Sequence, residues 1–488
     1  MTAGTGEAHR SPRHAARGIL QGVVGRGLSF GCAYLATIIL ARKLGPEDYG
    51  TYGMVISVLL WIEQTGRFTI PPAAAKLIPE QHERAGAIQE AALIICLVLF
   101  TALGALLWLA ATPLASLFDI GDEGARLFRV AALDLPIFGA YSVYRGVLQG
   151  HHEFLALSIS DVIYAAGKLA AVIVLLASLT LPGALLTNIA ASAAALLYVG
   201  LRTPIRVGRP ASHIVRLLVR LALPLGVYML MLQTITNLDL WSLKVFASTD
   251  DAATIGRYVA ARNLAVVPGV VLMVVSDILL PSLSRALAAN DVRASRMYIQ
   301  GAVRFVSISM APIVLILMVG ADDFMALLYS GEFRPAGAYV RILVLYAVSL
   351  PFVDLFASAL SASGKPYRGG VTLLSVIPVI VFLNVVLVGR YGAIGAAYGS
   401  ALAGGLCTMA LGIMVINRFG ALMTPRTLIN IVAAMLLMAT AAHYASVYAL
   451  PAWTYVGCLA IYGLALIALR EIGRDDLAPL AFWKWGLR

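Results

Sequence analysis

Long apolar stretches constrain the fold of this 488-residue chain more than any other feature. About fourteen of them are long enough to cross roughly 30 Å of hydrocarbon. Charged residues make up only 12% of the chain and the mean hydropathy is +0.87, whereas a soluble domain has about twice that charged fraction. We therefore predict an all-α, polytopic membrane protein with spans near 18–41, 49–67, 87–111, 127–147, 155–179, 182–201, 217–240, 257–280, 302–320, 338–360, 370–389, 392–416, 427–448 and 452–470.

The distribution of Lys and Arg predicts the orientation of these spans. With the N-terminus inside, the basic residues concentrate in the segments that fall on the cytoplasmic side, as the positive-inside rule requires. The densest of these segments is "RTPIRVGRPASHIVRLLVR" (202–220), between the sixth and seventh spans. Both termini are expected to be cytoplasmic. The net charge of +11 follows from this topology and needs no nucleic-acid partner.

Similar short motifs recur along the chain at a spacing of about 210 residues, which predicts an internal repeat. One pair is "DYGTYGMV" (48–55) and "TIGRYVAA" (254–261). Because each copy would hold six helices, an even number, both copies should enter the membrane in the same orientation. The predicted organisation is a cytoplasmic tail 1–17, an N-lobe 18–201, a cytoplasmic linker 202–216, a C-lobe 217–416, two extra helices 427–470 and a cytoplasmic tail 471–488.

The segment "ARKLGPEDYGTYG" (41–53) is predicted to be the outer turn of the first helical hairpin. Gly45 is a suitable residue to end a helix, and Pro46 cannot continue one. Extended to "LARKLGPEDYGTYGMVIS" (40–57), the segment resembles the first-hairpin signature of the polysaccharide-transport branch of the multidrug/oligosaccharidyl-lipid/polysaccharide exporter superfamily. The stretch "YVAARNLAVVPGVVLMVVSDILLPSLSRAL" (258–287) is similar to the eighth helix of lipid II flippases in that superfamily.

The resemblance implies two six-helix lobes around a cavity lined by helices 1, 2, 7 and 8. It implies a flippase that moves an undecaprenyl-diphosphate-linked oligosaccharide between leaflets of the bacterial cytoplasmic membrane by alternating access, for surface polysaccharide synthesis. The implied partners are that substrate, membrane lipids, and the polysaccharide polymerase and glycosyltransferases of the same process. A lipid II flippase and a cation-coupled multidrug antiporter remain alternatives within the superfamily. A membrane polymerase or ligase would be expected to carry a long outer loop, which this sequence lacks.

A diphosphate and its sugars cannot cross hydrocarbon without polar partners, so basic residues within or at the ends of spans are the substrate-binding candidates. They are Arg26, Arg67, Lys168 and Arg262, and the resemblance places cavity arginines at Arg26 and Arg262. Structural ion pairs are the alternative role for these residues. Arg67 could equally be a topological anchor.

Six acidic residues lie within or at the ends of spans: Glu63, Asp134, Asp161, Asp239, Asp277 and Asp354. Some would neutralise the arginines, and Asp239, Glu63 and Asp354 are the candidates for binding a coupling ion, either sodium or a proton. Pro224 and Pro268 interrupt helices beside the expected cavity and are the candidate gating points. No nucleotide loop, metal cluster or nucleophile elbow occurs, so we expect a transporter rather than an enzyme, without a cofactor and driven by a gradient or by substrate flux.

Overall fold

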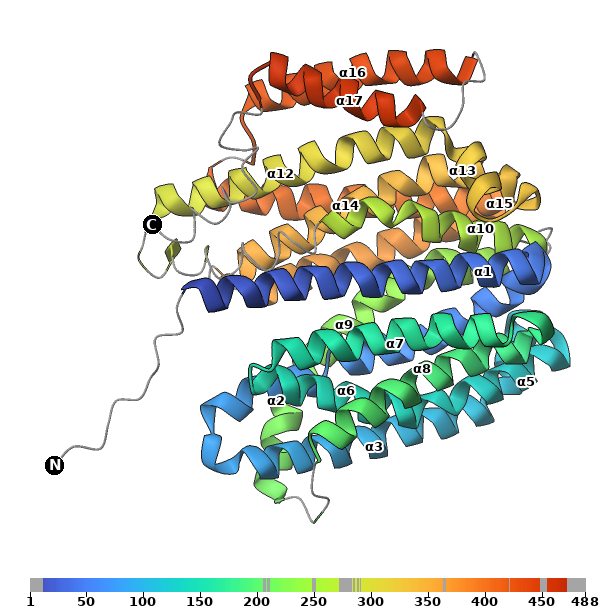
Figure 1. Ribbon diagram of the computed structural model, residues 1–488, viewed down its shortest axis with the longest axis vertical. Coiled ribbons are helices and arrows are strands. Elements are labelled where there is room, and N and C mark those ends of the chain that lie inside the picture. Colours follow the sequence, from blue (N-terminus) through green and yellow to red (C-terminus); the bar gives the residue numbers. More distant parts are fainter. Residues whose placement is uncertain are drawn as a thin grey trace. The chain divides into compact units, whose positions relative to one another are not determined.

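The computed structural model describes residues 12–471, except 205–207, 209–210, 248–251, 272–282, 284–285, 288, 290, 363–365, 421 and 448–453. Every element of regular structure in the described part of the chain is a helix (Figure 1). Ten of these helices are long and apolar enough to cross a membrane. Each span predicted from the sequence overlaps a helix, so the prediction of an all-α membrane fold is confirmed. Asp277 and most of the predicted tails lie outside the described residues.

The chain divides into two compact units, residues 1–237 and 238–488. The division falls inside α9 (Ser212–Phe246), whereas the sequence placed the lobe boundary in the preceding linker at 202–216. The first part of α9 belongs to unit 1 because it packs there. A methyl group on Gly226 of α9 would lie 3.0 Å from the Thr69 side chain, and Trp61 Nε1 donates a hydrogen bond of 3.0 Å to Thr234 Oγ1.

Unit 1 begins with α1 (Pro12–Arg67), which combines the first two predicted spans. A straight helix of 56 residues would be about 84 Å long, more than twice the hydrocarbon thickness. The helix is broken at Gly45, whose φ of 73° and ψ of 174° lie in a region open essentially to glycine alone. The predicted turn therefore lies where the sequence placed it.

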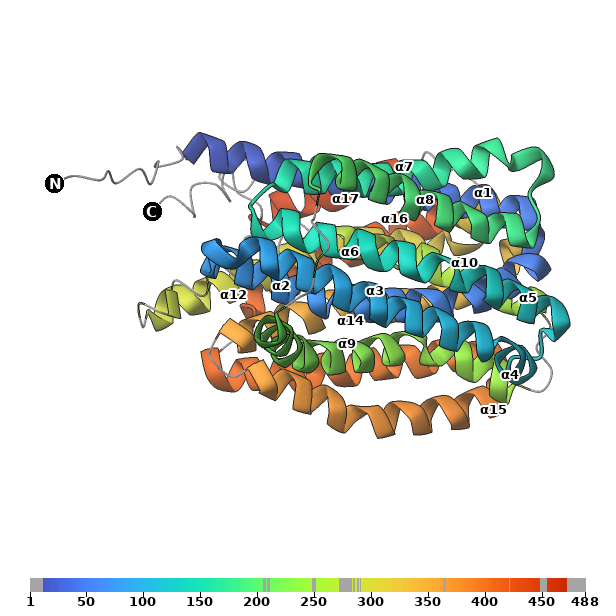
Figure 2. The same ribbon diagram turned by 90° about the horizontal axis from the view of Figure 1, so that it is seen from below.

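The other helices of unit 1 pack closely through small residues. Gly146 on α6 lies against the Pro71 carbonyl of α2, where an added Cβ would come within 2.4 Å of the oxygen. Figure 2 shows α7 and α8 side by side. The elements are α2 (Ile70–Glu80), η1 (His82–Arg84), α3 (Ala85–Leu109), α4 (Ala111–Leu117), α5 (Gly121–Ala132), α6 (Asp134–Gly150), α7 (Phe154–Val174), η2 (Leu176–Ser178) and α8 (Leu181–Arg202).

Unit 2 contains the rest of α9 and a second long helix broken at a glycine. This helix, α15, combines two predicted spans and breaks at Gly392, which has a φ of 56°. The other elements are α10 (Ala252–Ala265), η3 (Val267–Val271), α12 (Val292–Val319), α13 (Ala321–Leu328), η4 (Gly331–Ala336), α14 (Gly337–Ala362), α15 (Pro366–Phe419), α16 (Pro425–Val447) and α17 (Thr454–Ala468).

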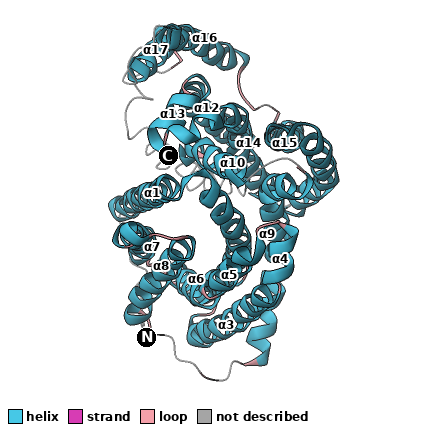
Figure 3. Cartoon of the chain, turned by 90° about the vertical axis from the view of Figure 1, so that its right-hand side faces the viewer, coloured by secondary structure: helices cyan, strands magenta, loops and turns pink. Residues whose placement is uncertain are grey.

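The last two helices form a hairpin that packs on α12 (Figures 1 and 3). Their shared core is apolar and includes Met438 of α16, Tyr462 of α17 and Ile316 of α12. The Tyr462 hydroxyl donates a hydrogen bond of 3.0 Å to the Ile308 carbonyl of α12. The hairpin is thus an integral part of unit 2.

Candidate functional site

Two helices of unit 2 bring a predicted ion-coupling residue, Asp239, next to a predicted substrate-binding residue, Arg262. Asp239 lies on α9, and Tyr258 and Arg262 lie one turn apart on α10. Arg262 Nη1 is 3.6 Å from Asp239 Oδ1. The Tyr258 hydroxyl donates a hydrogen bond of 2.8 Å to Asp239 Oδ2, and the Leu240 N–H donates one of 2.8 Å to Asp239 Oδ1. The predicted coupling residue and the predicted substrate ligand therefore form one ion pair.

The Asp239 carboxylate accepts hydrogen bonds in addition to its contact with Arg262. The Asp239 side chain is 2% exposed, and each of its oxygens already accepts a hydrogen bond from a neutral donor. The Arg262 side chain is 18% exposed, and its contact is longer than a hydrogen bond. The carboxylate therefore has two hydrogen bonds that do not depend on Arg262.

A second group of predicted residues meets in unit 1. Glu63 of α1 and Asp134 at the start of α6 have neighbouring carboxyl groups, and both side chains are buried. Lys168 of α7 acts electrostatically on both carboxyl groups, and Arg67 acts on Glu63. Both Asp134 oxygens and Glu63 Oε1 make no hydrogen bond of good geometry. The structure thus places Arg67 and Lys168 near the acidic pair of Glu63 and Asp134.

The sequence analysis missed Arg145 of α6, which is central to a third group. Arg145 Nη2 donates a hydrogen bond of 3.0 Å to Asp161 Oδ2 on α7. The Tyr141 hydroxyl donates one of 3.3 Å to Asp161 Oδ1. Arg67 and Arg26 both act electrostatically on Asp161. Asp161 therefore pairs directly with Arg145.

The remaining predicted residues lie outside these three groups. Asp354 is exposed on α14, and Pro224 is exposed within α9. Pro268 lies in η3, just after α10 ends at Ala265, so the helix is interrupted where the sequence predicted. Within the described residues, no three His, Cys, Asp or Glu side chains are grouped to hold a metal ion.

A further polar cluster in unit 2 ties the C-terminal hairpin to α12. Glu471 lies just after α17 and is almost buried, and its carboxylate accepts hydrogen bonds from Arg304 Nε at 2.9 Å, Thr427 Oγ1 at 2.8 Å and Asn430 Nδ2 at 2.8 Å. Burial would raise the pKa of Glu471, but the hydrogen bonds from Asn430, Thr427 and Arg304 outweigh it and lower the pKa.

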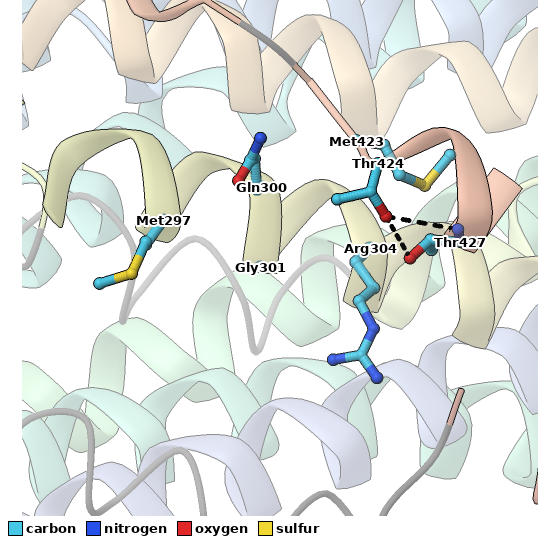
Figure 4. Close-up of a pocket in the computed structure, with 7 residues that line it drawn as sticks. All are labelled: Met297, Gln300, Gly301, Arg304, Met423, Thr424 and Thr427. Atoms are coloured by element: carbon cyan, nitrogen blue, oxygen red, sulfur yellow. Dashed lines mark hydrogen bonds between the residues drawn. The ribbon is translucent and has the colours of Figure 1, made fainter. Parts of the chain in front are cut away.

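Beside this cluster is a cleft of about 230 Å³ between α12 and the start of α16 (Figure 4). None of the predicted site residues lines it. The lining residues are Met297, Gln300, Gly301, Arg304, Met423, Thr424 and Thr427.

The ten described helices that are long and apolar enough to cross a bilayer define a polytopic membrane protein. Residues 15–287 match the family described as "Polysaccharide biosynthesis protein". This match covers more than half of the chain, which therefore belongs to that family. The family resemblance proposed from the first hairpin and from 258–287 is confirmed.

Two curated relatives match along most of their length. The chain is 26% identical over 344 residues to the succinoglycan biosynthesis transport protein ExoT of Rhizobium meliloti, covering 69% of this chain and 67% of that protein. It is 22% identical over 380 residues to the stage V sporulation protein B of Bacillus subtilis, covering 70% of this chain and 71% of that protein.

Solved structures show the same fold at low sequence identity. The lipid II flippase MurJ in an inward closed conformation superposes with a TM-score of 0.78 at 13% identity, covering 94% of this chain and 99% of MurJ. An inward-facing multidrug resistance MATE family transporter superposes with a TM-score of 0.69 at 15% identity, covering 82% of this chain and 98% of the transporter.

Proposed function

We propose that the protein moves an oligosaccharide carried on undecaprenyl diphosphate from the inner to the outer leaflet of the bacterial cytoplasmic membrane by alternating access. The product would serve the synthesis of a surface polysaccharide. Membership of a polysaccharide biosynthesis family supports this proposal, and so does the likeness to a succinoglycan transport protein. Glycosyltransferases would supply the substrate and a polymerase would consume it.

The observation that carries the proposal is the arrangement of Arg262 on Asp239. A guanidinium group within a membrane span costs free energy, so an arginine in that position is a candidate functional residue. Its planar fork matches the oxygens of a phosphate, and hydrogen bonds between the two are charge-assisted. Because Tyr258 and the Leu240 N–H already satisfy Asp239, Arg262 can transfer to a diphosphate and return.

The acidic pair of unit 1 supports coupling to an ion gradient. Two buried carboxylates side by side repel each other, and a shared proton relieves that repulsion. Glu63 and Asp134 have this arrangement, with Lys168 as the neighbouring cation. We assign proton uptake to this pair. Asp239 would instead bind Arg262 between transport cycles.

The substrate can be tested by mass spectrometry of the lipid-linked saccharides in a strain deleted for this gene. We expect one undecaprenyl-diphosphate-linked repeat unit to accumulate and to disappear when the gene is restored. Accumulation of lipid II would favour the peptidoglycan alternative. A normal lipid profile combined with hypersensitivity to cationic drugs would favour the antiporter.

A further inference from the structure

The cleft between α12 and the start of α16 is a feature of unit 2 that the proposed function does not use. Its volume is about 230 Å³, and its lining combines apolar and polar side chains (Figure 4). Met297, an exposed residue of α12, and Met423, just before α16, are the apolar side chains. Gln300 and Arg304 of α12 are among the polar ones. Such a lining fits an amphipathic ligand.

The position of the cleft along α12 corresponds to the edge of a bilayer. With 28 residues, α12 is about 42 Å long, which matches the thickness of a bilayer including its headgroups. Counted from Val292, where the helix begins, Met297 lies about 8 Å and Arg304 about 18 Å along the helix axis. The cleft therefore extends from the level of the headgroups into the adjoining hydrocarbon.

Basic residues outnumber acidic ones at the four helix ends that meet around the cleft. These are the starts of α12 and α16 and the ends of α15 and α17. Both carboxylates there already accept hydrogen bonds, Asp291 from the Ala294 N–H at 2.8 Å and Glu471 from Arg304 Nε at 2.9 Å. A positive region at this depth attracts anionic lipids. Within the described residues of 291–304, 411–427 and 466–471, the acidic residues are Asp291 and Glu471, and the basic ones are Arg293, Arg296, Arg304, Arg418, Arg426 and Arg470.

Arg296 is the arginine best placed to act at the mouth of the cleft. Gln300 and Arg304 follow it at intervals of four residues, so all three lie on one face of α12. Its guanidinium packs against the turn that ends α15, where a Cβ on Gly420 would lie 3.5 Å from both Cζ and Nη1. In the part of the chain that the structure describes, Arg296 has no hydrogen bond or ion pair. Its donors are therefore available to a ligand.

The threonines of the cleft are bonded within its wall. Thr424 Oγ1 accepts a hydrogen bond of 3.3 Å from the Thr427 N–H and donates one of 2.9 Å to Thr427 Oγ1, as the dashed lines in Figure 4 show. Thr427 Oγ1 in turn donates to Glu471 Oε1 at 2.8 Å. Arg296 and the Gln300 amide are thus the donors that face no such competition.

We propose that this cleft binds the headgroup of an anionic phospholipid. The lipid phosphate accepts charge-assisted hydrogen bonds from Arg296 and a further hydrogen bond from the Gln300 amide. The beginning of an acyl chain lies against Met297 and Met423, whose flexible side chains adapt to an irregular ligand. The site uses neither Arg262 nor the transported substrate, so it stands whether or not the proposed function is correct.

The bound lipid would also strengthen the attachment of the C-terminal hairpin. It would contact α12 through Arg296 and Gln300 and the segment before α16 through Met423. A ligand that binds the folded state alone raises its stability by mass action. Phosphatidylglycerol should therefore raise the unfolding temperature of the protein.

The test is titration of the purified full-length protein in detergent with phosphatidylglycerol, followed by native mass spectrometry. The unmodified protein should retain the lipid at low lipid concentration. Arg296→Gln should weaken retention by about five- to tenfold, and Arg296→Lys should weaken it less because it keeps the charge. Gly301→Leu places a bulky side chain in the cleft without changing the charge, and it should abolish the tight retention.

The matched control is Arg418→Gln. Arg418 is exposed in the last turn of α15, among the same helix ends, but it does not line the cleft. Its loss should change retention by less than about twofold. Thermal unfolding without lipid identifies the variants that fold, and phosphatidylglycerol should stabilise Arg418→Gln but not Arg296→Gln. Equal weakening by the two arginine variants in folded protein would indicate general attraction to the surface and overturn the proposal.

Two further arms distinguish the possible ligands. Phosphatidylcholine, which carries its own cation beside the phosphate, should be retained more weakly than phosphatidylglycerol, and equal retention of the two would contradict recognition of an anionic headgroup. Inorganic phosphate is titrated by calorimetry into the same protein. If its binding depends on Arg296 while phosphatidylglycerol retention does not, the cleft takes a soluble phosphate and the lipid proposal is wrong.

Discussion

Arg262 of α10 and Asp239 of α9 form an ion pair with 3.6 Å between Nη1 and Oδ1. The carboxylate is 2% exposed and the guanidinium 18% exposed. Asp239 also accepts hydrogen bonds from Tyr258 and from the Leu240 N–H, so the carboxylate does not depend on Arg262 alone, whereas the guanidinium is partly exposed. This asymmetry suits a ligand that must bind and be released in each cycle.

We predict that Asp239→Asn lowers transport while diphosphate binding is retained. The amide removes the charge that draws Arg262 back, so the return step should slow. It also removes the charge of the Asp239 contact with Arg262, and unfolding should become easier by on the order of 1–3 kcal/mol. The measurements are calorimetry and polymer export at matched protein abundance. Normal export from this variant would show that Asp239 does not take part in the cycle.

Glu63→Gln is predicted to uncouple transport from a proton gradient. The amide cannot take up a proton and does not repel the Asp134 carboxylate, so the repulsion that favours proton uptake by the pair is lost. Flipping in proteoliposomes with an imposed pH gradient should lose its dependence on that gradient. Glu332→Gln is the matched control because Glu332 is exposed in η4. An unchanged response of the Glu63 variant would exclude this residue as the coupling site.

The sequence predicted the helices better than the contacts between them. The glycine breaks and the spans follow from hydropathy and backbone preference, which are local properties. Asp239 and Arg262 were both singled out, but their pairing depends on the packing of α9 against α10. Arg145 was missed, although the pattern Y-x-x-x-R at 141–145 repeats that at 258–262 and could have revealed it.

Glu471 was predicted to be the first residue of the cytoplasmic tail 471–488. In the structure its side chain is 7% exposed and bonds to α12 and α16. The sequence alone does not show whether a glutamate is solvated or accepts hydrogen bonds from donors on distant helices, here Arg304 of α12 and Thr427 and Asn430 of α16.

Glu471→Gln is therefore predicted to destabilise the C-terminal hairpin by about 1.5–3 kcal/mol, the range for a hydrogen bond to a charged group. Because the pKa of Glu471 is lowered in the folded protein, its contribution is complete above the usual glutamate pKa and is lost as the pH falls through the lowered value. The measurement is thermal unfolding in detergent across acid pH, where the variant should show a flatter profile.

Arg470→Gly is predicted to stabilise the folded protein, whereas Glu471→Gln at the adjacent position is predicted to destabilise it. Arg470 has a φ of 55°, a conformation that costs an L-residue roughly 1–2 kcal/mol and glycine almost nothing. This variant should unfold at a higher temperature than the unmodified protein. If both variants shifted stability in the same direction, the described geometry at the end of α17 would be wrong.

The proposed topology predicts that cysteines introduced at Ser212 and Glu332 react with an impermeant thiol reagent from opposite sides. Both residues are exposed, Ser212 at the start of α9 and Glu332 in η4. Glu332 should label in intact cells and Ser212 only after lysis, since the basic segment at 202–220 should be cytoplasmic. Labelling of position 212 in intact cells would contradict the orientation.

The most direct test of the central claim is translocation of an undecaprenyl-diphosphate-linked oligosaccharide in proteoliposomes, read out with an impermeant glycosidase. Unmodified protein should make the inner-leaflet pool accessible to the enzyme. Arg262→Ala should reduce accessibility to that of protein-free liposomes. Arg262→Lys should give an intermediate rate, because lysine keeps the positive charge but lacks the planar set of N–H donors of the guanidinium group. Translocation at the unmodified rate by well-folded Arg262→Ala protein would contradict the account.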